Sequence, residues 1–358
     1  MIAAEATDCG CRFTFAVRAR ESVLSYTHET SLHLYAQAPA KFSDLHISVS
    51  FWRDDIFRVT LTGPKPYADP FAGIPESARM LVGKPETVKI DKAETDSEWI
   101  LSTSSVSVHI NKETGRISAE DAHGSPVFAQ KRSEFKAADI FDYAVSELEG
   151  DYVCHEALEL ENDEVIWGLG ERFDGIVRNG RVVDFWNKDA VGTTSRRTYV
   201  NIPFFMPSKG YGLFLNSGAQ TQWEIGTLDT GALQFSIWEP QMDYFVIASG
   251  TPKDILKGYC TLTGFSKLPP LWSFGLWMSR NSYTSWDVTD EIARQLRQHD
   301  IPCDVLHLDT EWFKENWNCD LKFSPERFPE PEKHMVVYKK RRVPCFSLSV
   351  QLHSAQRQ

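Results

Sequence analysis

Asp309 is the residue with the most evident chemical potential, because it directly follows the apolar run Val305-Leu306-His307-Leu308. Such a run predicts a buried strand, and polar residues at the carboxyl ends of the strands of a (β/α)₈ barrel form its active-site face. An ionised carboxylate there can accept hydrogen bonds from two hydroxyl groups. Thr310, Glu311 and Trp312 come next and could line the same pocket, Trp312 with a flat ring for stacking. The alternative is that Asp309 only caps a short helix.

Other reactive residue types give weaker signals. Glu171-Arg172 could be read as acid/base machinery, but we expect a structural role for this pair, holding its domain against the barrel. Cys9 and Cys11 form a CxC pair without a second pair or a histidine cluster to complete a zinc site. Neither a P-loop nor a G-x-G-x-x-G fingerprint occurs. We therefore expect no metal and no organic cofactor.

The elements around Asp309 predict the beginning of a barrel. Residues 274–278 and 305–308 are the expected first two strands, and the helix between them should run from Asp287, as its N-cap, to His299. Trp277 is expected in the core. This amounts to one βαβ unit, and residues 270–358 are far fewer than the roughly 250 that a complete barrel needs.

The pattern before residue 265 is different, with short alternating runs separated by turns. The clearest runs are Leu45–Val49, Val59–Leu61, Val106–Ile110, Tyr211–Asn216 and Tyr244–Ile247, with a turn at Asn111–Ile117 in which Gly115 can take positive φ. Many short strands at this spacing predict a large β-sandwich. A short helix should follow from Pro252, capped by Thr251. The stiff Pro269-Pro270 pair marks the boundary.

We therefore expect a mainly β chain with a β-sandwich over residues 1–268 and the start of an incomplete (β/α)₈ barrel over 269–333. Residues 334–358 contain the basic run Lys339–Arg342 and a possible third strand at Cys345–Val350, and we interpret them as a divergent tail.

Composition excludes several classes of partner. The net charge of −11 disfavours binding to nucleic acid, which requires a basic surface. No stretch approaches the roughly 18 apolar residues of a membrane span, and the first residues lack the apolar run of a signal peptide. The seven scattered cysteines do not suggest a disulfide framework. A cytoplasmic location is expected.

Five motifs, in order, resemble those of glycoside hydrolase family 31, the retaining α-glucosidases and α-xylosidases. They are Trp167-Gly168-Leu169-Gly170-Glu171-Arg172-Phe173, Trp186-Asn187-Lys188-Asp189, Asn201–Met206 with Gly210-Tyr211-Gly212, Leu268–Trp277 and His307-Leu308-Asp309. The resemblance implies a galactose-mutarotase-like sandwich followed by a catalytic barrel. It is closer to the α-xylosidase branch, and it implies α-linked xylosyl or glucosyl saccharides as ligands.

Site residues follow from this resemblance. Asp309 matches the family's aspartate that holds sugar hydroxyls, and Asp189 would come from a sandwich loop to the pocket rim, unless it is only a solvated loop carboxylate. Ser282 and Tyr283 lie in the segment that would fill the space of a missing hydroxymethyl group. The family's nucleophile and acid/base are aspartates on later barrel strands, so we assign no catalytic residue here.

Three interpretations stay open. The chain is a truncated α-glycosidase, inactive alone, whose tail reflects a frameshift, a retained intron or a fragmentary gene model. Alternatively, it is a non-catalytic β-sandwich that binds carbohydrate or a protein. A sugar epimerase is a third reading, but it would need a histidine and a glutamate paired inside the sandwich, and the sequence shows no convincing pair.

Overall fold

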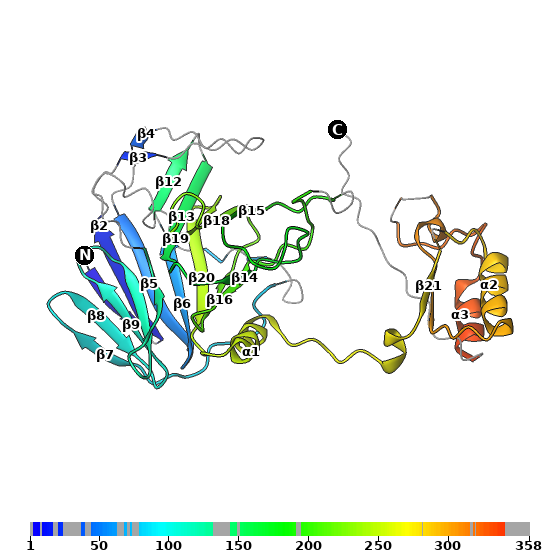
Figure 1. The fold of residues 1–358 in the computed structure, drawn as a ribbon, viewed down its shortest axis with the longest axis horizontal. Helices are drawn as coiled ribbons and strands as arrows, with labels where there is room; N and C mark the ends of the chain where they lie inside the picture. Colours follow the sequence, from blue (N-terminus) through cyan, green and yellow to red (C-terminus); the bar gives the residue numbers. More distant parts are fainter. Residues whose placement is uncertain are drawn as a thin grey trace. The chain divides into compact units, whose positions relative to one another are not determined.

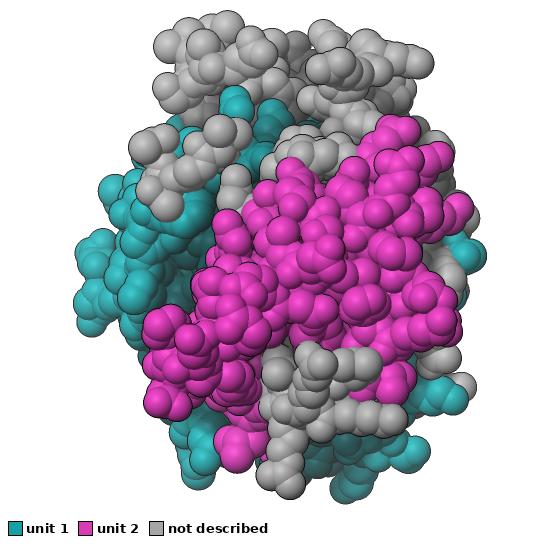
Figure 2. All heavy atoms as spheres, turned by 90° about the vertical axis from the view of Figure 1, so that its right-hand side faces the viewer, with its two compact units in different colours: residues 1–265 teal, residues 266–358 magenta. Residues whose placement is uncertain are grey.

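The computed structural model describes residues 3–7, 9–16, 21–23, 37–39, 44–62, 68–69, 72–73, 79–131, 144–148, 151–190, 195–280, 282–315, 318 and 320–340. The chain divides into two compact units, Met1–Phe265 and Ser266–Gln358, which are coloured separately in Figure 2. None of the helices in the described part is long and apolar enough to cross a membrane.

Unit 1 is built from antiparallel sheets (Figure 1). The largest has the order β1 (Ala3–Thr7), β2 (Gly10–Ala16), β5 (Asp44–Arg53), β6 (Ile56–Thr62), β20 (Gln241–Ile247), β17 (Gly212–Leu215), β16 (Phe204–Pro207) and β14 (Ile166–Gly168). A second has the order β12 (Ala144–Leu148), β13 (Asp151–Glu159), β19 (Ala232–Ile237), β18 (Thr221–Ile225) and β15 (Arg181–Phe185). A third has the order β11 (Pro126–Ala129), β10 (Ile117–Asp121), β9 (Val106–Asn111), β8 (Glu98–Ser102) and β7 (Asp91–Glu94), and β3 (Glu21–Val23) pairs with β4 (Gln37–Pro39).

The sheets share one hydrophobic core, because alternate residues of each strand point inward. Trp223 of β18 stacks on Phe235 of β19 with ring centroids 4.4 Å apart, and Phe235 meets Tyr244 of β20 edge-on at 6.2 Å. Phe57 of β6 meets Phe128 of β11 edge-on at 5.8 Å. The predicted β-sandwich is confirmed, and the five clearest strand predictions coincide with β5, β6, β9, β17 and β20.

Local predictions in unit 1 also agree with the structure. The Thr251 side chain accepts a hydrogen bond from the backbone N–H of Asp254 and so caps helix α1 (Pro252–Thr263). Gly115 has a φ of 75° in the turn between β9 and β10. Both residues were expected in these roles because side-chain oxygens cap helices and glycine tolerates positive φ.

Among the described residues of unit 2, β21 (Trp277–Ser279) and β22 (Val305–His307) form a parallel strand pair connected through helix α2 (Trp286–Gln298). The predicted first strand began too early. Residues Leu271–Phe274 form the 3-10 helix η3 after the extended Pro270, and strand pairing starts only at Trp277. The predicted N-cap was also wrong. Ser285 caps α2 by accepting a hydrogen bond from Val288 N–H, while Asp287 lies in the first turn.

The helices of unit 2 pack on one face of this strand pair. Met278, Leu306 and Leu308 join a core with residues of α2 and of α3 (Pro331–Lys340). Tyr338 of α3 is buried there and donates a hydrogen bond to Asp290. Trp277, expected in the core, is instead exposed, because it points to the opposite face. The helix α3 includes the first part of the predicted tail, and Cys345–Val350 lies outside the described residues.

Candidate functional site

Asp309 lies just beyond the carboxyl end of β22, with φ 58° and ψ −144°. Glycine adopts this backbone region readily, whereas other residues pay about 1–3 kcal/mol in strain. Asp309 occupies the N-cap position of the 3-10 helix η4 (Thr310–Trp312), yet its side chain makes no capping hydrogen bond. The capping explanation is therefore not supported, and a strained carboxylate at a strand end favours a functional role.

Ser282 is the predicted site residue that the structure places beside Asp309. The two residues form an isolated antiparallel backbone bridge, so the segment after β21 meets the turn after β22. Both segments leave their strands at the carboxyl end, which is the functional face of a parallel barrel. Asn281, which directly precedes Ser282, lies outside the described residues.

Tyr283 does not line a pocket as predicted. Its ring is fully buried in the core of unit 2, and its hydroxyl donates a hydrogen bond of 3.1 Å to the carbonyl of Met278. Burial raises the pKa of the Tyr283 hydroxyl. Packing of a large ring stabilises the core. Tyr283 therefore anchors the segment that carries Ser282 to the core of unit 2.

Trp312 does not offer the predicted stacking plane. The side chain is 2% exposed, and its ring lies 4.2 Å from that of Phe313 and 4.8 Å from that of Phe323. Its indole N–H has no hydrogen-bond partner among the described residues. The face of the Trp312 ring is therefore not available for stacking on a sugar.

The other two residues of η4 are held by the chain around them. Thr310 is buried, and Glu311 is half-buried with its carbonyl accepting a 3.1 Å hydrogen bond from Arg327. Arg327 also donates to the carbonyl of Phe313 at 2.6 Å. This arginine fixes the path of the chain directly after Asp309.

Sequence reasoning missed Ser279 and the polar role of His307. These residues are paired in register on β21 and β22, and Ser279 Oγ lies 3.0 Å from His307 Nδ1. The signal was present, because His307 interrupts an apolar strand between Leu306 and Leu308, and alternation places it opposite the helical core.

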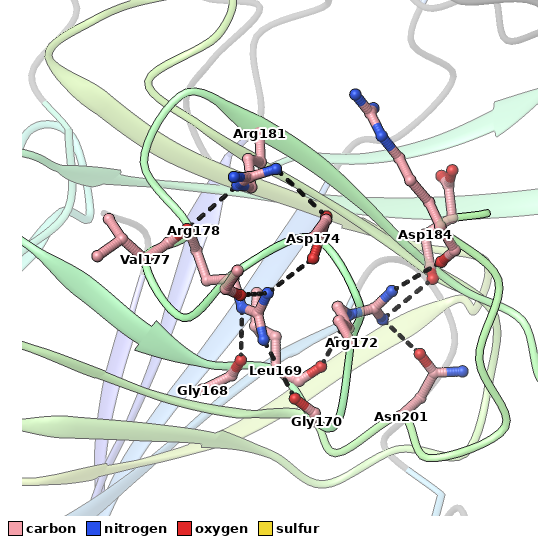
Figure 3. A network of polar contacts seen from close by, with 12 residues as sticks. Gly168, Leu169, Gly170, Arg172, Asp174, Val177, Arg178, Arg181, Asp184 and Asn201 are labelled. Carbon is pink, nitrogen blue, oxygen red and sulfur yellow. Dashed lines mark hydrogen bonds and ion pairs between the residues drawn. The ribbon is translucent and has the colours of Figure 1, made fainter. Parts of the chain in front are cut away.

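The predicted site residue Asp189 belongs to unit 1, where it is exposed in the loop after β15. The loop is held through its neighbour Asn187, whose Oδ1 accepts a 2.7 Å hydrogen bond from Asn201 Nδ2. Arg172 in turn donates to Asn201 Oδ1 (Figure 3). A chain of three side chains therefore connects the Trp167–Phe173 motif to the loop that carries Asp189.

Arg172 contacts partners that lie within the sandwich, and the expected role of Glu171-Arg172 in holding this domain against the barrel stays a prediction. It donates to the carbonyls of Leu169 at 3.0 Å and Asp184 at 3.3 Å, and its guanidinium lies 5.3 Å from the ring centroid of Phe185. Burial, and then the nearby Arg178, lower the pKa of Arg172 to about 10. A group with this pKa stays charged at neutral pH.

Arg178 fixes the glycine-rich part of the same motif (Figure 3). It donates to the carbonyls of Gly168 at 2.8 Å, Gly170 at 3.2 Å and Gly175 at 2.6 Å, and it forms an ion pair of 2.9 Å with Asp174. A Cβ at Gly170 would lie 2.0 Å from the carbonyl oxygen of Val200. Only glycine permits this close approach of the two loops.

Comparisons with known proteins agree with a sandwich domain followed by the start of a barrel. Residues 46–224 match the glycosyl hydrolase 31 N-terminal galactose mutarotase-like domain, and residues 266–353 match the glycosyl hydrolases family 31 TIM-barrel domain. The α-xylosidase XylQ of Lactiplantibacillus pentosus is 44% identical over 181 residues, which are 49% of this chain and 23% of that protein. An α-xylosidase of Saccharolobus solfataricus is 29% identical over 304 residues, 83% of this chain and 39% of the relative.

A solved structure shows the same fold. A family 31 α-xylosidase from a soil metagenome, complexed with xylose, superposes with a TM-score of 0.71 at 17% identity and covers 97% of this chain and 46% of that one. The chain thus spans between about a quarter and a half of the length of these proteins. With matches to both domain models in the order of the sequence motifs, the chain belongs to glycoside hydrolase family 31.

Proposed function

We propose that this chain provides the sugar-binding part of a retaining α-glycosidase of the α-xylosidase type. The observation that carries the proposal is Asp309, a strained carboxylate at the carboxyl end of β22 that makes no capping hydrogen bond. Such a carboxylate can accept hydrogen bonds from two neighbouring sugar hydroxyls. The two similar α-xylosidases support xylosides as the substrate class.

Cleavage requires more than this site. A retaining glycosidase uses two carboxyl groups about 5–5.5 Å apart, one as nucleophile and one as acid/base. The described sheet of unit 2 consists of β21 and β22, and the family resemblance places both catalytic aspartates on later barrel strands. We therefore propose that a polypeptide of these 358 residues binds the sugar without hydrolysing it.

Sugar preference should be weak at this site. Because Tyr283 is buried in the core, only Ser282 of the predicted pair can face a ligand beside Asp309. A serine side chain fills little of the space that a hydroxymethyl group occupies, and such a difference discriminates by only about 1–3 kcal/mol. We propose that xylosides and glucosides are both accepted.

The test follows the indole N–H signal of Trp312 by NMR, assigned with a Trp312→Phe variant, during titration with methyl α-xyloside. The signal should shift saturably in the wild type, should not shift in Asp309→Asn, and should shift normally in the control Asp287→Asn. A response that persists unchanged in Asp309→Asn would refute the sugar-binding role of Asp309.

Hydrolysis is measured separately with 4-nitrophenyl α-xyloside. We expect nitrophenol to be released no faster than by spontaneous hydrolysis of the substrate in buffer without protein. Turnover by the purified chain that disappears on heat denaturation would contradict the proposal that the catalytic pair lies elsewhere.

A further inference from the structure

The strand pair of unit 2 carries a polar pair of side chains on the face that points away from helices α2 and α3. Met278, Leu306 and Leu308 belong to the core that these helices form with the strands. Alternate residues of a strand point to opposite faces, and on the other face Ser279 and His307 lie side by side in register. A largely apolar strand pair thus presents a hydroxyl and an imidazole next to each other.

The hydroxyl of this pair is accessible from solvent. Ser279 is exposed and His307 is half-buried, and Ser279 Oγ lies 3.0 Å from His307 Nδ1. A serine hydroxyl has one hydrogen to donate and two lone pairs that can accept. The contact with the imidazole uses one of these and restricts how the hydroxyl is oriented. Ser279 Oγ therefore keeps hydrogen-bonding capacity for a ligand in a restricted direction.

Unit 1 contains the same pair of side chains in a different environment. His155 Nδ1 also lies 3.0 Å from Ser236 Oγ, but His155 is only 6% exposed and its Nε2 atom is buried. A ligand in solvent cannot reach that imidazole. The contact between a serine and a histidine therefore does not define a binding site by itself, and the exposure of Ser279 is what distinguishes the pair in unit 2.

The exposed pair lies next to Asp309. His307 and Asp309 are two residues apart, so their Cα atoms are separated by at most about 7 Å. The backbone bridge between Ser282 and Asp309 also joins the segment that follows Ser279 to the turn after β22. Because β21 and β22 are parallel, all of these residues lie at the carboxyl end of the pair, which is the functional face of a barrel. One sugar ring can therefore come within reach of both Ser279 and Asp309.

The substrate class offers a hydroxyl group for this second contact. Xylosides and glucosides carry hydroxyls on three adjacent ring carbons, and the Asp309 carboxylate can accept hydrogen bonds from two neighbouring ones. The third hydroxyl then needs a partner that can donate or accept. The exposed hydroxyl of Ser279 can do either.

We propose that Ser279, oriented by His307, is a second sugar-binding residue beside Asp309 and bonds the third hydroxyl of a xyloside or glucoside. This inference rests on the proposed function, because it places Ser279 in the same site. It adds a specificity for that site. A sugar that lacks the third hydroxyl should bind more weakly, because a group built to bond a hydroxyl loses its partner.

The test measures the affinity of the full chain for methyl α-xyloside and its three monodeoxy analogues, from the indole N–H signal of Trp312. Ser279→Ala should weaken the binding of methyl α-xyloside about fivefold, the usual effect of one lost hydrogen bond. It should not weaken the binding of one of the analogues, because that analogue already lacks the contact. Ser236→Ala, the matched control at the buried pair of unit 1, should change none of these affinities.

A second readout needs no variant at the pair other than for assignment. The imidazole signals of His307, assigned with a His307→Gln variant, should shift saturably with methyl α-xyloside in the wild type. Those of His155 should stay unchanged. This titration decides the question even if far-UV circular dichroism shows that Ser279→Ala fails to fold.

Three results would overturn the inference while the proposed function stands. They are an unchanged affinity for methyl α-xyloside in Ser279→Ala, an equal loss of affinity for all three deoxy analogues, and His307 signals that do not move while the Trp312 signal shifts. The second of these would mean that Ser279 only supports the fold of the site. A Trp312 signal that does not shift in the wild type would instead refute the proposed function, and this inference with it.

Discussion

Leu169 in unit 1 and Asp309 in unit 2 are both non-glycine residues at positive φ, and the turns that hold them differ in what offsets the backbone strain. Leu169 has a φ of 62° and Asp309 a φ of 58°. The Leu169 side chain is fully buried in the sandwich core, so hydrophobic burial offsets its strain. Asp309 is only half-buried and forms no capping hydrogen bond. Strain without a structural gain is the more informative of the two, because it points to a function.

The two turns are nevertheless fixed by the same device, an arginine that donates to backbone carbonyls. Arg178 serves the turn at Leu169 and also has a carboxylate partner in Asp174. Arg327 serves the chain after Asp309 through the carbonyls of Glu311 and Phe313. The turn at Leu169 thus depends on an ion pair, whereas the turn at Asp309 depends on neutral carbonyl acceptors and on the backbone bridge to Ser282.

The largest effect is expected when the ion pair of the sandwich turn is broken. Arg178→Ala removes this donor from three carbonyls and leaves Asp174 with the longer, 3.6 Å ion pair to Arg181. Removal of one partner of a buried pair costs about 3–5 kcal/mol. Urea unfolding followed by tryptophan fluorescence measures this loss.

Arg181→Ala is the matched control for Arg178→Ala. Arg181 is more exposed and lies 3.6 Å from the same Asp174, so its loss should cost less than about 1 kcal/mol. Equal losses for the two variants would show that the ion pair does not fix the turn.

A smaller effect, which depends on pH, is expected at His155 of the sandwich. Its pKa is about 4 in the folded chain and about 6.5 when unfolded. As the pH falls below 6.5, the unfolded state takes up a proton that the folded state refuses, so the free energy of unfolding decreases down to pH 4 and then levels off. The difference between pH 7 and pH 4 should be about 3 kcal/mol.

The His155→Gln variant isolates this contribution, because other groups titrate in the same range. Urea unfolding curves at several pH values should show a shallower pH dependence for the variant than for the wild type. Parallel profiles would mean that the pKa of His155 is the same in the folded and the unfolded chain.

The sequence predicted the sandwich, the strand pair and the special position of Asp309 because these leave local signals. Alternating apolar residues give strands, Thr251 before Pro252 gives a helix start, and an aspartate after an apolar run gives a strand end. The position of the α2 cap was missed because Ser285 and Asp287 are both good capping residues, and the choice between them depends on where Trp286 packs.

Burial of site residues could not be predicted in the same way. Tyr283 and Trp312 are aromatic residues next to polar ones, and the sequence does not reveal which face of the ring meets the core. The pair of His155 and Ser236 was invisible for another reason, since 81 residues separate them and only the register of β13 and β19 brings them together.

The smallest effect, and the one that best separates the two turns, is the substitution of each strained residue by glycine. Asp309→Gly removes about 1–3 kcal/mol of backbone strain and adds about 0.4–1 kcal/mol of unfolded-state entropy, so the variant should be more stable by about 1 kcal/mol while it loses the sugar response of Trp312. Asp309→Ala keeps the strain and should show no gain. Leu169→Gly relieves the same strain but deletes a buried side chain, and it should destabilise the sandwich. Urea unfolding of the three variants measures these changes, and a loss of stability in Asp309→Gly would mean that the carboxylate has a structural partner after all.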